Sequence, residues 1–105
     1  MTDDVIYLGR YIWSRSKADL NITNHRIRFE DAVKVFSNPL SVEDYDDLHS
    51  EYEDRWNITG RIGETVVTVS YTLRGELIRI ISAYDADSED EEAYYENIKR
   101  FIGTR

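Results

Sequence analysis

The segment that most constrains the fold is residues 53–84, because it predicts three strands joined by very short connections. Its middle part, residues 65–72, is almost entirely β-branched or aromatic, and such residues favour a pleated strand. Gly63 and Gly75 stand on either side of this part, and glycine supplies the positive φ that tight hairpins need. Short connections make consecutive strands antiparallel. We therefore predict a three-strand meander with strands at residues 55–61, 65–72 and 76–83.

An N-terminal strand and a short helix are predicted ahead of the meander. Residues 5–13 are mostly apolar or aromatic, with Gly9 as an interruption, which indicates one strand with a bulge at Gly9. We expect this strand to pair with the meander as its fourth strand. Ser14 is a suitable N-cap for a helix over residues 15–24, in which Asn21 is expected to bind nearby backbone groups.

A second helix and a C-terminal helix complete the predicted elements. Apolar residues at helical spacing predict the second helix, which Pro39 ends: Phe29, Ala32, Val33 and Phe36. Residues 41–52 form an acidic loop, in which residues 42–45 suit a short edge strand. Ser88 and Glu91 have the spacing of a capping box, and the helix they begin ends at Gly103. Its apolar side holds Tyr94, Tyr95, Ile98, Phe101 and Ile102.

The predicted fold class is α+β, with a compact antiparallel sheet, two N-terminal helices and a C-terminal helix. A chain of 105 residues is enough for one domain, which we expect to span residues 1–105. There is no cysteine, so disulfides and thiolate metal sites are excluded. No apolar run approaches the ~20 residues of a membrane span, and the acidic start at residues 1–4 does not resemble a secretory signal. We expect a cytoplasmic protein that does not engage a membrane.

The negative charge of the chain is concentrated in two segments. The net charge is −8, and residues 42–56 and 85–96 each carry seven acidic residues, with Arg55 as the single base among them. An acidic surface repels phosphate and attracts basic partners. These segments are either solvated loops and helix faces or a docking surface for a cationic partner.

The common signatures of phosphate loops, zinc proteases and nucleophile elbows are missing. The chain has two histidines, His25 and His49, and their spacing does not indicate a metal site. We predict neither a metal nor a cofactor.

A set of short segments occurs in a characteristic order between about Tyr11 and Tyr95. These segments are Trp13-Ser-Arg-Ser-Lys17, Asn21-Ile-Thr-Asn-His25, Ile27-Arg-Phe29-Glu30-Asp31-Ala32, Val35-Phe36-Ser-Asn-Pro39-Leu40, His49-Ser50, Glu53-Asp54-Arg55, Gly60-Arg61, Tyr71-Thr72-Leu-Arg74-Gly75 and Ile78-Arg79-Ile80-Ile81-Ser82-Ala83. Together they resemble the BrnT family, the toxin half of a bacterial type II toxin–antitoxin pair. The resemblance implies a RelE-like ribonuclease fold, metal-independent RNA cleavage and neutralisation by a partner antitoxin, BrnA.

RNA cleavage of this kind needs a base for the 2′-hydroxyl, an acid for the leaving oxygen and cations for the phosphate. The predicted catalytic residues are His49, Glu53, Arg55, Arg79 and Tyr84. The predicted RNA- or phosphate-binding residues are Lys17, His25 and Arg74, and His25 is also a candidate for proton transfer.

Three of these residues also have structural interpretations. Arg79 lies in the middle of a predicted strand and suits a structural ion pair. His25 suits the end of a helix, and His49 suits a solvated acidic loop.

The chain departs from the family pattern after Ile81-Ser82-Ala83. Family members usually continue with Arg and then a basic helix start, whereas this chain has Tyr84 and an acidic run over residues 85–92. The glycine that usually follows the family histidine is here Arg26. These changes favour a second hypothesis, in which the chain is an inactive relative. It would then act as an immunity- or antitoxin-like binding protein for a basic toxin or a nucleic-acid-binding protein.

Overall fold

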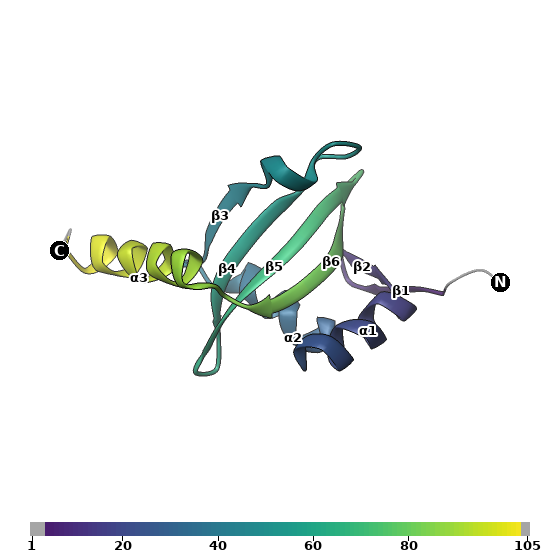
Figure 1. Ribbon diagram of the computed structural model, residues 1–105, viewed down its shortest axis with the longest axis horizontal. Helices are drawn as coiled ribbons and strands as arrows, with labels where there is room; N and C mark the ends of the chain where they lie inside the picture. The colour runs from purple at the N-terminus through teal and green to yellow at the C-terminus, as the bar shows by residue number, and fades with distance from the viewer. Residues whose placement is uncertain (1–3, 104–105) are drawn as a thin grey trace.

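A six-stranded sheet forms the centre of the computed structural model, which describes residues 4–103 (Figure 1). The strands lie in the order β1-β2-β6-β5-β4-β3. Their bounds are β1 Val5–Leu8, β2 Tyr11–Ser14, β3 Val42–Tyr45, β4 Trp56–Ile62, β5 Thr65–Arg74 and β6 Leu77–Asp85. The acidic start of the chain at residues 1–3, which bears on the prediction of no secretory signal, lies outside the described residues.

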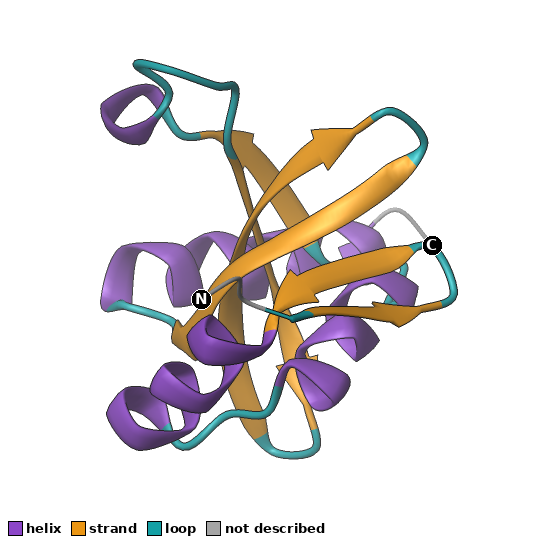
Figure 2. Ribbon diagram, turned by 90° about the vertical axis from the view of Figure 1, so that its right-hand side faces the viewer, coloured by secondary structure: helices purple, strands orange, loops and turns teal. Residues whose placement is uncertain are grey.

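The predicted meander is confirmed as β4, β5 and β6, each antiparallel to the next. Gly63 and Gly75 occupy the two connections with φ of 61°, the left-handed region that glycine enters without steric cost. A register shift between Ser70 and Tyr71 interrupts the β5–β6 ladder. Such an irregularity increases the local twist, and the strong twist of the sheet is visible in Figure 2.

The N-terminal prediction of one bulged strand is wrong. Gly9 has φ of 59° and turns the chain into a hairpin of β1 and β2, because a two-residue connection with a left-handed glycine reverses the chain. β2 then pairs with β6 in parallel, through Tyr11 beside Ile78 and Ile12 beside Arg79. The sheet therefore has six strands and one parallel pair, instead of four antiparallel strands. The edge strand over residues 42–45 is present as β3.

The first helix is confirmed as α1, Arg15–His25. The Ser14 hydroxyl accepts a hydrogen bond from the backbone N–H of Lys17 at 3.2 Å, as a capping residue does. Arg26 ends the helix with φ of 59°.

The second predicted helix is α-helical only over α2, Phe29–Ala32, and continues as the 3₁₀ helix η1, Val33–Ser37. Phe29, Ala32 and Val35 are all fully buried. A spacing of three residues matches the three residues per turn of a 3₁₀ helix, so the tighter winding brings Val35 into the core. The predicted stripe had Val33 and Phe36 in place of Val35, and both of these are only partly buried.

The core lies between one face of the sheet and the N-terminal helices. It consists of Trp13, Phe29, Ala32, Val35, Ile58, Val67, Val69, Tyr71, Ile80 and Ala83. Side chains alternate along a strand, so Val67 and Val69 face this core while Ser70, Thr72 and Arg74 lie on the opposite face. The opposite face of the sheet is therefore lined by polar groups.

The C-terminal helix α3, Ser88–Gly103, projects away from the sheet (Figure 1). The capping residue is Asp87 instead of the predicted Ser88, because its carboxylate accepts the backbone N–H of Asp90 at 2.8 Å. Of the predicted apolar side, Tyr94 is 3% exposed, whereas Phe101 and Ile102 are each 60% exposed. The pattern predicted the helix, but only the part near Tyr94 packs tightly against the molecule.

No helix within residues 4–103 is long and apolar enough to cross a membrane.

Candidate active site

Side chains from several segments meet in a hollow on the polar side of the sheet. We call it the histidine hollow, and it is lined by His25, Asp46, His49, Arg55, Ser70, Ile81, Ser82 and Tyr84. Four of these residues were predicted as site residues from the sequence: His25, His49, Arg55 and Tyr84. They come from α1, the β3–β4 connection and β6, so the fold brings together groups that are far apart in the chain.

Asn21 explains how His25 reaches this hollow from a helix. Its side-chain amide donates to the carbonyl of Ala83 at 2.9 Å, and its carbonyl oxygen accepts the N–H of Ala83 at 3.1 Å. Asn21 thereby takes the backbone groups that a neighbouring strand would take, at a part of β6 beyond its pairing with β2. The amide also donates to the carbonyl of Ile27 at 2.9 Å, and this bond holds the chain where it leaves α1. The end of α1 is thus fixed beside β6.

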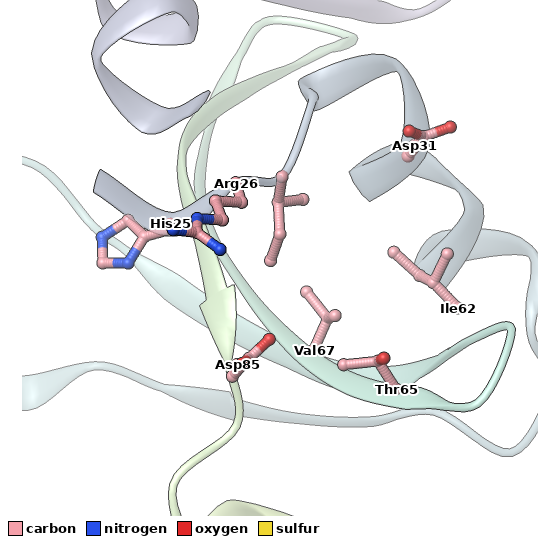
Figure 3. Close-up of a pocket in the computed structure, with 8 residues that line it drawn as sticks. His25, Arg26, Asp31, Ile62, Thr65, Val67 and Asp85 are labelled. Carbon is pink, nitrogen blue, oxygen red and sulfur yellow. The ribbon is translucent and has the colours of Figure 1, made fainter. Parts of the chain in front are cut away.

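The His25 ring lies beside Tyr84, with 5.9 Å between the ring centres. His25 also borders a second hollow, together with Asp31, Ile62 and Asp85. Figure 3 shows the His25 ring pointing away from Asp31 and Ile62. The ring is therefore directed away from the inner wall of this second hollow.

His49 is held by Asp46 at the start of the short 3₁₀ helix η2, Asp47–His49. Its Nδ1 atom lies 2.9 Å and 3.0 Å from the two carboxylate oxygens of Asp46. Burial alone would raise the pKa of Asp46, but the hydrogen bonds from His49 and Asn57 outweigh it and lower that pKa. Asp46 thus stays ionised beside the imidazole.

Tyr84 remains a proton donor in this setting. Burial raises its pKa, and the charges of Asp90, Asp46 and Asp87 raise it further, against an opposing hydrogen bond with Ser70. Asp87 and Asp90, at the start of α3, thus place negative charge beside Tyr84.

Glu53 connects the histidine hollow to a neighbouring group of arginines. Its carboxylate binds Arg55 Nη2 at 3.3 Å and Arg74 Nη2 at 3.1 Å. Within residues 4–103, no acceptor reaches the buried Nε atom of Arg55. A buried N–H group without a partner is uncommon in folded proteins.

Arg74 and Arg79 line a separate hollow with Val5, Tyr7, Ile12, Trp13 and Ser14, which we call the arginine hollow. The structure therefore divides the predicted residues into two neighbouring groups joined by Glu53. Lys17 is exposed on α1 and, of the described residues, is not one that lines either hollow.

Asp46, Ser70 and Ser82 were not predicted as site residues. A signal for Asp46 was present, because Asp46 and His49 have the spacing of a side chain that caps a turn three residues ahead. Ser70 in β5 and Ser82 in β6 lie opposite each other, but this pairing becomes visible only once the register is known.

Among residues 4–103, no group of three or more His, Cys, Asp or Glu side chains is arranged to hold a metal ion.

Comparison with known proteins identifies the family. No match to a curated protein was found. Residues 13–90 match the family model described as the ribonuclease toxin BrnT of a type II toxin–antitoxin system. The match covers most of the chain and includes every residue of the histidine hollow. The chain therefore belongs to the BrnT family of ribonuclease toxins.

Proposed function

We propose that the chain is a metal-independent endoribonuclease, and that the histidine hollow is its catalytic site. The observation that supports this proposal is the meeting of two imidazoles, one guanidinium and one phenol in a single hollow. Transfer of a proton to and from RNA oxygens needs groups that titrate near neutral pH, and imidazole is the side chain that does so without perturbation.

The proposed reaction is an internal transfer at phosphorus. His49 takes the proton of a ribose 2′-hydroxyl, and the resulting oxygen attacks the adjacent phosphorus. The bond from phosphorus to the 5′ oxygen breaks, and the His25–Tyr84 pair returns a proton to that oxygen. The products are a 2′,3′-cyclic phosphate and a free 5′-hydroxyl, so no water or cofactor is consumed.

The arginines hold the phosphates in this proposal. Arg55 binds the reacting phosphate through its guanidinium group, because Arg55 lines the histidine hollow. Glu53 orients Arg55 and Arg74 instead of moving a proton, because its two oxygens are already engaged by them. Arg74 and Arg79 then bind a neighbouring phosphate in the arginine hollow, and Lys17 contacts the RNA backbone further away.

The family implies an antitoxin partner, and we propose that this partner is of the BrnA type. A RelE-like arrangement of the sheet and a cytoplasmic location, where RNA and an antitoxin meet, belong to the same proposal.

The test is induced expression of the chain in a bacterial host without the antitoxin. We expect growth arrest and RNA fragments with 2′,3′-cyclic phosphate ends, produced by the purified protein also with EDTA present. His49→Ala and Arg55→Ala should each reduce the cleavage rate about 10²- to 10⁴-fold. Lys99→Ala, an exposed cation on α3, is the matched control and should cleave like the wild type. Normal growth with intact RNA would remove the proposal.

A second candidate function is favoured by the acidic groups beside Tyr84. The charges of Asp90, Asp46 and Asp87 all raise the pKa of Tyr84. In this alternative the chain is an inactive family member that binds a basic toxin or a nucleic-acid-binding protein. Pull-down should then recover a basic protein whose binding weakens steeply with salt, and the chain should cleave no RNA. Recovery of an acidic antitoxin alone would exclude this alternative.

A further inference from the structure

The contact between Asp46 and His49 lies in the loop between β3 and β4, and hydrogen bonds within this loop support it. The Asp46 side chain is 12% exposed, whereas the His49 side chain is 64% exposed. Asp46 also accepts the backbone N–H of His49 through Oδ1 at 3.3 Å, so the same carboxylate holds both the main chain and the ring. The more exposed partner of the pair, the imidazole, is thus held by the less exposed one.

Asp46 is itself tied to the start of β4. Its N–H donates to the carbonyl of Arg55 at 2.9 Å, and its carbonyl accepts the hydroxyl of Ser50 at 2.6 Å. The Ser50 hydroxyl in turn accepts the N–H of Arg55 at 2.9 Å. These bonds close the loop between β3 and β4, and they hold His49 and Arg55 in one fixed relation.

We propose that Asp46 is a positioning residue that keeps His49 in the tautomer with the proton on Nδ1, so that Nε2 is free to accept the 2′-hydroxyl proton. This chemical role of Asp46 rests on the proposed function, whereas the tautomer of His49 follows from geometry. A carboxylate can only accept hydrogen bonds, so the nitrogen beside it must carry the hydrogen. In a neutral imidazole the other nitrogen then has the lone pair.

The other polar residues that line the histidine hollow do not offer His49 a competing acceptor of the same strength. Arg55, the residue before β4, is a cation, and His25 from α1 is a second imidazole. Tyr84 and Ser82 from β6 and Ser70 from β5 are hydroxyl groups. Asn57 from β4 hydrogen-bonds to Asp46, which strengthens the hold on the carboxylate.

The test compares Asp46→Asn with Asp47→Asn, a matched change at the next, exposed residue. Asparagine can present either an oxygen or an N–H group to the ring, so it no longer selects one tautomer. Nitrogen-15 NMR of the folded wild type should show His49 with its proton on Nδ1, and Asp46→Asn should show a mixture. The kcat for RNA cleavage should fall about 10²- to 10⁴-fold in Asp46→Asn, with KM nearly unchanged. Asp47→Asn should match the wild type in both measurements.

A second measurement separates positioning from folding. In His49→Gly, added imidazole should restore part of the cleavage, and it should restore much less when Asp46→Asn is also present. Equal rescue in both backgrounds, or a wild-type His49 with its proton on Nε2, would overturn the inference. If the wild type cleaves no RNA, the proposed function fails, and the tautomer alone then decides whether Asp46 holds His49 as inferred.

Discussion

Asn21 is the residue on which the position of His25 depends. We expected it to bind nearby backbone groups, and it does so at Ile27, but its two bonds to Ala83 span 62 positions of the chain. Such a long-range contact leaves no local pattern in the sequence. The same reason explains why His25 and Tyr84 were each selected as candidates while their 5.9 Å contact was not foreseen.

Replacement of Asn21 by alanine should destabilise the protein. The change leaves the buried N–H and carbonyl of Ala83 without partners, and we expect a loss of about 2–4 kcal/mol in the free energy of unfolding. Urea unfolding followed by circular dichroism measures this loss. Asn24→Ala, at an exposed position of the same helix, is the control and should change the midpoint little. An unchanged midpoint for Asn21→Ala would contradict the anchoring role.

At the scale of elements, the parts with strong local signals were predicted well. The meander follows from β-branched runs and glycines, and α1 follows from its N-cap. The N-terminal hairpin was missed because Gly9 is compatible with a bulge as well as a turn. The turn is selected by the pairing of β2 with β6, which is a long-range contact. The 3₁₀ winding of η1 was missed because burial of Val35 depends on the opposing sheet.

The contact between β3 and the start of α3 brings acidic groups together. Partial burial raises the pKa of Asp44, and the charges of Asp46 and Glu89 raise it further. A carboxyl group whose pKa is raised by folding opposes folding when it is ionised. The penalty is present at neutral pH and disappears as the pH falls below the unfolded value of about 4.

Asp44→Asn should therefore stabilise the protein at pH 7 and have no such effect at pH 3. Solvent screens the charge of this exposed group, so we expect a gain of at most about 0.5 kcal/mol. The urea midpoints of the variant and the wild type at the two pH values measure it. Asp19→Asn, which removes an exposed charge from α1, should show no comparable gain at pH 7. A stabilisation of equal size at both pH values would show that charge is not its cause.

At the scale of the whole molecule, a few cations must bind RNA against a net charge of −8. The sequence already shows this conflict between RNA binding and negative charge, and the structure shows where the opposing charges lie. Arg55 and Arg74 converge on Glu53, while Asp87 and Asp90 lie on the side of Tyr84. The attraction between the arginines and phosphate acts over contact distances. The repulsion between the net negative charge of the protein and the RNA acts over the width of the molecule.

This difference in range predicts an unusual salt dependence of RNA cleavage. The Debye length falls from about 30 Å at 0.01 M salt to about 8 Å at 0.15 M, so moderate salt removes the long-range repulsion before it weakens the contacts with arginine. We expect kcat/KM for a long RNA to rise over this range and to fall only at higher salt. A dinucleotide with one phosphate is the control, because it carries little charge for the protein to repel, and its kcat/KM should rise much less. A rate for long RNA that falls steadily from the lowest salt is the behaviour of a basic ribonuclease, and it would show that a continuous positive surface governs binding in spite of the acidic composition.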